Sequence, residues 1–349
     1  MDAPADRSPD KHHIVIAGAG AVGGLVGGLL AGAGRAVTLL GREGAMRQIA
    51  EQGLRVTDRD GLDLTIAPAS FRAGSNPALL KTATLVLVTV KAGDTEEMGR
   101  SLATHLPPGV PVISLQNGVS NAALLRAALP DNPVLAGMVP YNVTRPEALH
   151  LHRGSAGKIH IETGRPELVK LLAVPGLQAV EEKDIEAVLW GKLLINLNNA
   201  LNALSGLPLR DQLRDRSWRH LLAAQIEEAN AILRMAGIRA KSPFPLPMLL
   251  LPSLLRLPAL AFDIVKMDAH ARSSMWDDLE RRRTTEIDFL QGEILALARR
   301  HELEAPVISG VTAAIKRAQA AQAGSPKLRA EQVIGFRHLL ADRYDRQKR

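Results

Sequence analysis

A glycine-rich turn between two apolar runs near the start of the chain constrains the fold more than any other feature. The stretch HIVIAGAGAVGGLVGGLLAGAGRAVTLLGRE begins at His13. The apolar run at 14–17 predicts a buried strand, the small residues at 18–33 predict a turn and a helix, and residues 36–40 predict a second strand. This order is that of a βαβ unit, in which the two strands lie parallel in one sheet.

The rest of the chain divides into two parts by the kind of element that its pattern predicts. Up to residue 184, further strands alternate with helices, and two antiparallel strands follow within 133–163. The strands are predicted at 54–58, 62–68, 84–91 and 110–118, and the helices at 95–106 and 119–129. After residue 184 the patterns are helical, at 184–203, 216–236, 275–301 and 306–322. We therefore predict an α/β fold, with an N-terminal Rossmann-type doubly wound sheet (12–184) and a C-terminal all-helical domain (185–342).

The glycines of the turn have the spacing of a dinucleotide-binding loop, G-x-G-x-x-G. The first glycine of such a loop permits a tight turn, the second lets the backbone approach a pyrophosphate, and the third allows close helix packing. The N-terminus of the following helix offers N–H groups and a positive dipole end to phosphates. We therefore predict that this loop binds a dinucleotide through Gly18, Ala19, Gly20, Ala21, Val22 and Gly23.

The residue at the end of the second strand indicates which dinucleotide binds. NAD-preferring sites carry an acid there, which accepts a hydrogen bond from the ribose 2′-hydroxyl. This strand ends in LLGRE, so that Gly41 and Arg42 take the place of the acid. Because arginine pairs with a 2′-phosphate by a charge-assisted contact, we predict NADP as the cofactor. The alternative is that Glu43 serves as the acid.

Two later loops carry polar residues where predicted strands end. Lys91 closes the strand at 84–91, and Gln116 and Asn117 close the next one. Ligands bind at the carboxyl ends of parallel strands, so we expect Lys91 and Asn117 beside the cofactor. Taken singly, each is equally an ordinary polar loop residue.

A helix after the domain boundary carries an unusual polar stripe. The stretch WGKLLINLNNALNAL holds four asparagines, which are mediocre helix formers. At about 100° per residue, Lys192, Asn196 and Asn199 fall within roughly 60° of each other, flanked by Asn198 and Asn202. A partly desolvated lysine on such a stripe can donate the proton that reduction of a ketone requires. The alternative is a buried amide network that ties helices together.

A second polar cluster lies in the stretch RSSMWDDLERRRTTEID. Ser274 with Asp277 has the spacing of a capping box. Glu286 then lies three turns into the predicted helix, about 120° from Ser274 if the helix is straight. Both reach one cleft only if Ser274 sits at the mouth of the helix. The alternative is an ordinary N-cap and a surface glutamate.

In order and spacing, these motifs resemble the ketopantoate reductase (2-dehydropantoate 2-reductase) family from about residue 13 to residue 320. The motifs are GAGAVGG, VTLLGR, TVKAGDT, QNGV, WGKLLINLNNALNAL and SSMWDDLERRRTTEID. The resemblance implies NADPH-dependent reduction of a 2-oxo acid to a 2-hydroxy acid, for pantothenate and coenzyme A synthesis. It further implies that Lys192 is the general acid, that Glu286 supports it, and that Asn196 and Ser274 contact the substrate. It implies cofactor contacts for Gly18, Gly20, Gly23, Arg42, Lys91 and Asn117.

The chain departs from the family in two places. The family's second helix asparagine often stands eight residues after the lysine, where this chain has Ala200. We predict that Asn199 replaces it as a substrate contact, with Asn202 as the alternative. The region 238–272 is long, leucine-rich and interrupted by prolines, which leaves open a larger or more apolar oxo acid as substrate.

Composition narrows the classes of function. The chain has no cysteine, which excludes disulfides and thiolate metal sites, and we predict no metal centre. Aromatic residues are 3% and no nucleic-acid-binding motif occurs. Part of the net charge of +7 lies in the tail RQKR at 346–349, and we attribute the remainder to anionic ligands. The N-terminal stretch lacks the apolar segment of a secretory signal, and we expect a cytoplasmic enzyme with a small-molecule substrate. Whether it forms a homodimer is left open.

The most apolar run, at 246–262, contains three prolines and Arg256. A membrane-spanning helix needs roughly 20 apolar residues, so we predict no span here. The run is predicted to be core, a dimer contact or an apolar lid over a cleft.

Three other functions remain as alternatives. A β-hydroxyacid dehydrogenase of the 6-phosphogluconate type also pairs a Rossmann domain with helices and uses a Lys-x-x-x-Asn pair, which Lys192 and Asn196 match. An opine-type dehydrogenase would condense an amine with a 2-oxo acid. A non-catalytic NADP-binding sensor would need the glycines and Arg42, but neither Lys192 nor Glu286.

Overall fold

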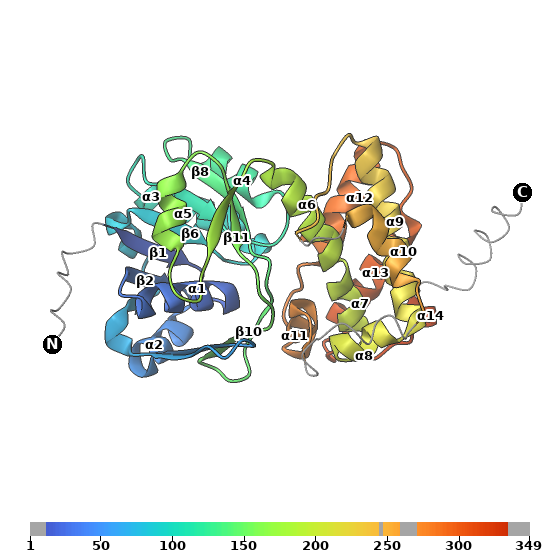
Figure 1. Ribbon diagram of the computed structural model, residues 1–349, viewed down its shortest axis with the longest axis horizontal. Helices are drawn as coiled ribbons and strands as arrows, with labels where there is room; N and C mark the ends of the chain where they lie inside the picture. The colour runs from blue at the N-terminus through green and yellow to red at the C-terminus, as the bar shows by residue number, and fades with distance from the viewer. Residues whose placement is uncertain (1–11, 244–246, 259–270, 334–349) are drawn as a thin grey trace, which may run out of the picture. The chain divides into compact units, whose positions relative to one another are not determined.

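A computed structural model describes residues 12–243, 247–258 and 271–333 (Figure 1). The chain divides into two compact units between Ile185 and Glu186. Within the described residues, every strand belongs to the first unit, and the second unit is helical. The predicted fold class, a doubly wound α/β sheet followed by a helical part, is confirmed.

The first unit is built on an eight-stranded sheet with the order β12-β11-β8-β7-β6-β1-β2-β5. Its strands are β1 (His13–Ala17), β2 (Ala36–Leu40), β5 (Arg72–Gly74), β6 (Leu85–Val88), β7 (Val112–Ser114), β8 (Val134–Met138), β11 (Ile159–Glu162) and β12 (Ala179–Glu182). Neighbouring strands are parallel except β8 and β11, which are antiparallel as predicted. The central strand β6 is buried at all four positions, because helices cover both faces of the sheet.

The helices of the first unit and its short 3-10 turns alternate with these strands. They are α1 (Ala21–Gly32), α2 (Glu43–Gln52), η1 (Pro68–Ser70), η2 (Pro77–Thr82), η3 (Ala92–Asp94), α3 (Thr95–His105), α4 (Asn121–Ala128) and α5 (Pro166–Leu172). The helices predicted at 95–106 and 119–129 are confirmed as α3 and α4. Strands β5 and β12 and helices α2 and α5 were not predicted.

Two strands predicted for the main sheet belong instead to a second sheet, with the order β4-β3-β10-β9. Its strands are β3 (Leu54–Asp58), β4 (Asp63–Ile66), β9 (Val143–Thr144) and β10 (His150–Arg153). The prediction was wrong because both strands carry exposed residues beside buried ones, as strands with one solvated face do, whereas both faces of the main sheet are covered. Strand β3 pairs in parallel with β10, a partner far away in the sequence.

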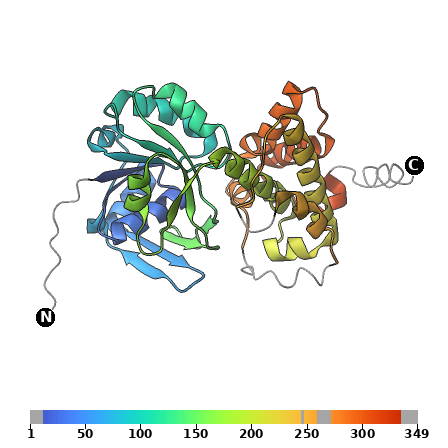
Figure 2. The same cartoon turned by 45° about the horizontal axis from the view of Figure 1, so that its top comes forward.

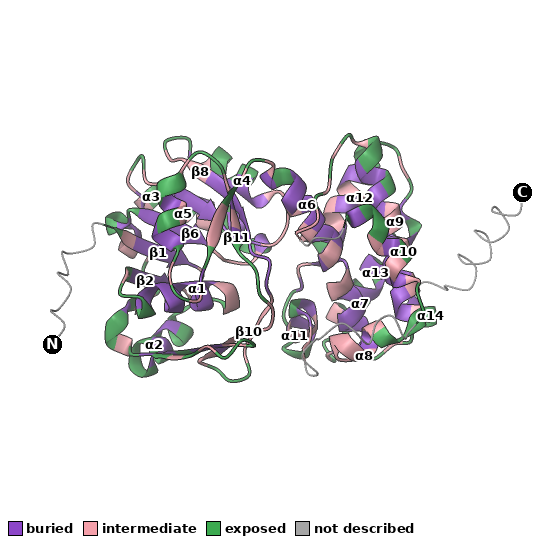
Figure 3. Ribbon diagram, viewed as in Figure 1, coloured by how far each residue is buried: buried purple, intermediate pink, exposed green. Residues whose placement is uncertain are grey.

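Helix α1 is packed between the two sheets, and its glycines make this possible. A Cβ at Gly27 would lie 2.5 Å from Leu39 of the main sheet, and one at Gly24 would lie 2.8 Å from Leu151 of the second sheet. Figure 2 shows the light-blue strands β3 and β4 beside this helix, and α1 contacts all four strands of the second sheet. As a result, α1 is buried from Gly23 to Ala31 (Figure 3).

The second unit consists of helices and short 3-10 turns. They are α6 (Ile185–Asn196), α7 (Asn198–Ser205), α8 (Leu209–Arg214), α9 (Arg216–Met235), η4 (Met248–Leu250), α10 (Leu251–Leu255), α11 (Ser274–Glu280), η6 (Ile287–Phe289), α12 (Gln291–Arg300), α13 (Pro306–Ala321) and α14 (Ala330–Val333). The helices predicted at 216–236 and 306–322 are confirmed as α9 and α13.

Two long predicted helices are broken. The helix predicted over 184–203 divides at Leu197 into α6 and α7, and the buried Gln291 donates a hydrogen bond to the Leu197 carbonyl there (3.0 Å). The helix predicted over 275–301 ends at Glu280, and Arg282 follows in the left-handed region at φ 54°. The Arg283 amide donates back to the Asp278 carbonyl (2.7 Å), which closes the end of α11.

The described part of the apolar run 246–262 forms η4 and α10. A buried arginine on α9, Arg219, donates to the carbonyls of Leu255 and Leu257 (3.0 Å each). These bonds tie α10 to α9, although Leu249 and Leu250 stay exposed (65% and 52%). Residues 246 and 259–262 lie outside the described residues, and the predicted lid stays a prediction. No helix among the described residues is long and apolar enough to cross a membrane.

Candidate functional site

The residues that directly follow β6 hold the glycine-rich loop in place. Gly18 adopts φ +108°, and a Cβ there would lie 2.5 Å from the Val90 nitrogen. The Thr89 hydroxyl donates to the Gly18 carbonyl (2.8 Å) and thereby holds the loop on the sheet. Thr89 was not predicted, because a threonine that closes an apolar strand has no distinguishing pattern.

The three motif glycines differ in their surroundings. A Cβ at Gly23 would lie 2.3 Å from the Thr89 hydroxyl and 2.4 Å from the Gly18 carbonyl, so close packing alone requires glycine there. A Cβ at Gly20 would meet nothing closer than 3.8 Å, and Gly20 is exposed at the N-cap of α1. The first turn of α1, which begins at Ala21 and Val22, contains no acidic residue. The open side of Gly20 therefore fits an anionic group bound by backbone N–H groups.

Arg42 follows the end of β2, as the sequence predicted. It is exposed and forms the N-cap of α2, so a positive side chain and a helix N-terminus occur together at the end of this strand. Glu43, the alternative acid, is paired with Arg47 one turn further along α2 (2.7 Å). This pairing weakens the case for Glu43 as a ribose-binding acid.

Lys91 and Asn117 lie at the same edge of the sheet as Gly18. Strands β1, β6 and β7 are parallel neighbours, so their carboxyl ends share one edge. The Gln116 side chain is held inside the unit and is not available to a ligand at this edge. Its buried amide donates to the Thr95 hydroxyl (2.7 Å) and accepts from Ser114 (3.0 Å). It joins β7 to the start of α3.

Lys192 lies near the end of α6 and is partly exposed. Desolvation lowers its pKa to about 8, because burial penalises the ammonium form. Asn196 is one turn further along the same helix and is buried, whereas Asn199 lies on α7 and is partly exposed. Lys192 thus has the acidity of a proton donor that works near neutral pH.

The predicted alternative, a buried amide network, holds for the two flanking asparagines. The Gln212 amide donates to Asn198 (2.8 Å), and Asn202 donates to the Leu207 carbonyl (2.9 Å) and to Gln212 (3.2 Å). Asn202 is fully buried. Asn202 therefore ties α7 to α8, which argues against it as the substrate contact that replaces the asparagine absent at Ala200.

The predicted cap at Ser274 is wrong by one residue, because Ser273 is the N-cap of α11. The Ser273 hydroxyl accepts from the Trp276 amide (3.1 Å) and donates to the Asn199 carbonyl (3.0 Å), and its own amide donates to Asn202 (2.8 Å). These three bonds select Ser273 as the cap. Ser274 becomes the first residue of α11, at the mouth of the helix, and is exposed.

Glu286 does not lie within a helix, contrary to prediction. It is a partly buried residue that precedes η6, and its carbonyl accepts from the Phe289 amide (3.1 Å). The neighbouring Thr285 donates both its amide and its hydroxyl to Gln319 of α13 (2.8 and 3.0 Å), which holds this turn in place. The 120° separation predicted from a straight helix therefore does not apply.

Among the described residues, no group of three or more histidine, aspartate or glutamate side chains is placed to bind a metal ion.

Known proteins share both units. Two family models match, ketopantoate reductase PanE/ApbA over residues 14–166 and its C-terminal counterpart over residues 184–319. A 2-dehydropantoate 2-reductase of Mesorhizobium japonicum is 30% identical over 334 residues, which cover 87% of this chain and 97% of that protein. The crystal structure of a PanE/ApbA family ketopantoate reductase from Ralstonia eutropha JMP134 matches with a TM-score of 0.77 and 28% identity, over 89% of this chain and 99% of that one.

A further structure is similar in fold alone. It is the ternary structure of D-mandelate dehydrogenase with NADH and anilino(oxo)acetate, with a TM-score of 0.76 and 19% identity, over 89% of this chain and 99% of that one.

Proposed function

The chain belongs to the ketopantoate reductase family of oxidoreductases, as its motifs predicted, and on that basis we propose that it reduces a 2-oxo acid to the 2-hydroxy acid with NADPH. The observation that carries the proposal is Lys192, a partly buried lysine whose pKa of about 8 suits proton donation. It occurs in a chain that also has a dinucleotide-type glycine loop.

The first unit, proposed as the NADP-binding domain (12–184), would hold the cofactor, which supplies hydride when bound. The open side of Gly20 and the acid-free first turn of α1 would bind the pyrophosphate. Arg42 would bind the 2′-phosphate, and Lys91 and Asn117 would contact the nicotinamide half of the cofactor.

The second unit, proposed as the catalytic and substrate domain (185–342), would supply the proton. The Lys192 ammonium would donate it to the substrate carbonyl oxygen as the carbonyl carbon is reduced. Glu286 would orient or tune this lysine. The side chains of Asn196, Asn199 and Ser274 would hold the substrate's carboxylate and hydroxyl groups, since amides and hydroxyls are neutral partners of fixed geometry.

The choice of NADPH over NADH rests on Arg42, a positive residue where an NAD site carries an acid. The D-mandelate dehydrogenase structure contains NADH, so NADH is the natural competitor to test. A binding titration with both cofactors decides between them.

The substrate is proposed to be 2-dehydropantoate, the substrate in the names of the relatives, or a bulkier oxo acid. The exposed Leu249 and Leu250 favour a bulkier one if the run 246–262 forms a lid. The test is NADPH oxidation with a panel of 2-oxo acids that includes 2-dehydropantoate and phenylglyoxylate. In the reverse direction, NADP+ reduction is measured with a β-hydroxyacid such as 6-phosphogluconate. Leu250→Ser should change the ranking of the panel if the run lines the substrate site.

Reduction of no 2-oxo acid, together with tight NADPH binding, would support the non-catalytic sensor instead. Oxidation of 6-phosphogluconate would support the β-hydroxyacid dehydrogenase. We further propose that the enzyme acts in the cytoplasm, and fractionation of cells that express a tagged chain tests this. Sedimentation of the purified protein decides between a monomer and a homodimer.

A further inference from the structure

We propose that Arg145 is a further cofactor-binding cation, which contacts the pyrophosphate of the dinucleotide at the glycine-rich loop. Its guanidinium Nη2 donates to the carbonyl oxygen of Ala19, between the first two motif glycines (3.3 Å). Arg145 is separated from this loop by 126 residues of sequence, and no motif points to it. The proposal rests on the proposed function only in that it requires a bound dinucleotide.

The second sheet explains how Arg145 reaches the loop. Leu151 of β10 packs on Gly24, in the first two turns of α1, where a Cβ would lie 2.8 Å away. Strand β9 runs antiparallel beside β10, with Thr144 opposite His152. Arg145 directly follows Thr144, so it emerges from the sheet over the N-terminal end of α1.

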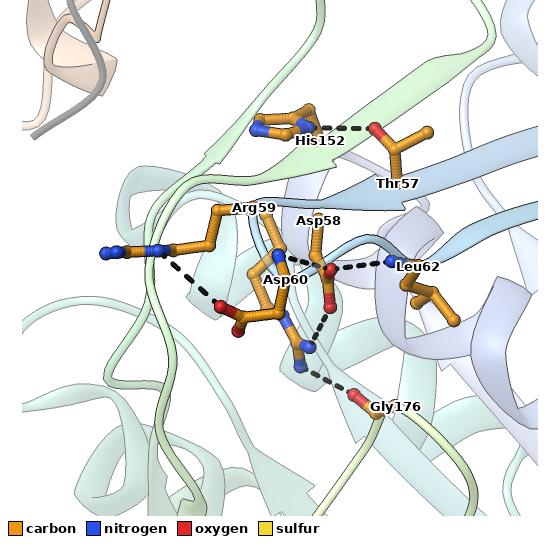
Figure 4. Close-up of polar contacts among 8 residues, drawn as sticks. Thr57, Asp58, Arg59, Asp60, Leu62, His152 and Gly176 are labelled. Atoms are coloured by element: carbon orange, nitrogen blue, oxygen red, sulfur yellow. Dashed lines mark hydrogen bonds and ion pairs between the residues drawn. The ribbon is translucent and has the colours of Figure 1, made fainter.

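A buried ion pair holds the second sheet in this position. The Asp58 carboxylate accepts from the amide of Leu62 (Figure 4) and pairs with the Arg153 guanidinium, which also donates to the Gly176 carbonyl. The side chains of Asp58 and Arg153 are only 5% and 12% exposed. Burial alone would raise the pKa of Asp58, but the bonds from Leu62 and Arg153 lower it below its ordinary value. The pair therefore stays charged at neutral pH and joins β3 to β10.

The chemistry of the position suits a phosphate. The N-terminus of α1 carries a positive partial charge, so an anion bound there would be stabilised both by the helix and by a cation beside it. Arginine is the side chain that binds phosphate bidentately, because its planar guanidinium has five N–H donors in a fixed geometry. A guanidinium that hydrogen-bonds the loop at Ala19 is held within reach of an anion on the open side of Gly20.

Arg145 and Arg42 should differ in what they recognise. Arg42 follows β2, at the position that reads the ribose 2′-substituent. Arg145 lies at the loop that binds the pyrophosphate, which NADPH and NADH share. Loss of Arg145 should therefore weaken both cofactors equally, whereas loss of Arg42 should weaken NADPH alone.

The experiment measures binding of NADPH and NADH to the full chain by fluorescence titration. Arg145→Ala is expected to weaken both by the same factor, about 10- to 100-fold. Arg145→Lys keeps the charge and should lose less. Arg145→Gln keeps a donor for Ala19 but no charge, and should lose as much as Arg145→Ala. Arg59→Ala, which removes an exposed arginine from the turn after β3, is the matched control and should bind as the wild type does.

Three results would overturn the proposal. Wild-type affinity in Arg145→Gln would show that the residue only braces the loop. Wild-type affinity in Arg145→Ala would show that it has no part in binding, and a loss confined to NADPH would move the contact to the 2′-phosphate. Thermal melts without nucleotide identify a variant that fails to fold, and Arg145→Lys then carries the comparison. A wild type that binds both cofactors but reduces no oxo acid would refute the reductase and leave this test intact.

Discussion

Replacement of Lys192 by methionine should remove most of the activity and at the same time stabilise the protein. Burial lowers the pKa of this lysine from 10.5 to about 8, so the folded chain disfavours the ammonium. One pKa unit corresponds to about 1.4 kcal/mol, so the charge costs the fold ~3 kcal/mol at pH 7. Methionine has a similar length and high helix propensity, and carries no charge. We expect the free energy of unfolding to rise by a large part of that amount.

The dependence on pH gives a second signature of the same residue. The unfolded chain binds the lysine proton more tightly than the folded chain, so wild-type stability should rise as pH increases from about 8 to 10.5. Lys192→Met should lack this contribution. Activity should move in the opposite direction, because the ammonium is the proton donor and disappears as pH rises through about 8.

The assay combines steady-state NADPH oxidation with denaturant unfolding at pH 7 and pH 10. Lys192→Met should lose about 10²- to 10⁴-fold in kcat, the usual contribution of a positioned acid, with NADPH affinity unchanged. Lys192→Arg should rescue poorly and should lose the inflection near pH 8, because guanidinium is a much weaker acid. Lys170→Met, which removes an exposed lysine of α5, is the control and should change neither quantity. Near-wild-type kcat in Lys192→Met would show that the polar stripe is structural. A lower free energy of unfolding in this variant would show that burial of the Lys192 ammonium does not destabilise the fold.

Further predictions concern the cofactor loop, the second strand and the α11 cap. Gly23→Ala should lower the free energy of unfolding by about 2 kcal/mol or more, since its Cβ would overlap two oxygens. Gly20→Ala should have the melting temperature of the wild type but bind cofactor more weakly. Equal melting temperatures for Gly23→Ala and Gly20→Ala would contradict the packing argument. Arg42→Ala should weaken NADPH about 10- to 100-fold and NADH little, whereas equal losses would exclude a 2′-phosphate contact. Ser273→Ala should cost about 1 kcal/mol in unfolding and raise KM for the oxo acid through Ser274, and an unchanged KM would separate the cap from the site.

Local sequence patterns predicted the elements that are buried in one simple way along their length. Strands β1 and β2 are continuous apolar runs because both faces of the main sheet are covered, and helix α9 has a single apolar stripe. Strands β3 and β4 were recognised as strands but assigned to the wrong sheet. Their alternating pattern shows that one face is buried and says nothing of the partner, which for β3 is β10. Register with a distant partner is set by tertiary packing, which no short window of sequence contains.

The candidate site shows the same limit at single residues. The pair of serines at the start of α11 is equally suited to capping, and bonds from α7 decide that Ser273 rather than Ser274 is the cap. The break after Glu280 depends on a left-handed Arg282, a conformation that arginine does not signal. Arg145 was not predicted because its partner, Ala19, is an alanine whose backbone makes the contact.

The residues of the two motifs fall into two groups, those that the packing of the fold requires and those that stay accessible to a ligand. In the glycine loop, Gly23 is required by contacts under 2.5 Å, while Gly20 has open space around it. In the asparagine stretch, Asn202 makes its hydrogen bonds within the protein core, while Asn199 is partly exposed and uses its carbonyl to position Ser273. A substitution at Gly23 or Asn202 should therefore be detected first as lost stability, and one at Gly20 or Asn199 first as lost binding. Only the second kind can report on cofactor or substrate choice, so mutational scans for specificity belong at Gly20 and Asn199 even though all four residues are equally conspicuous in the sequence.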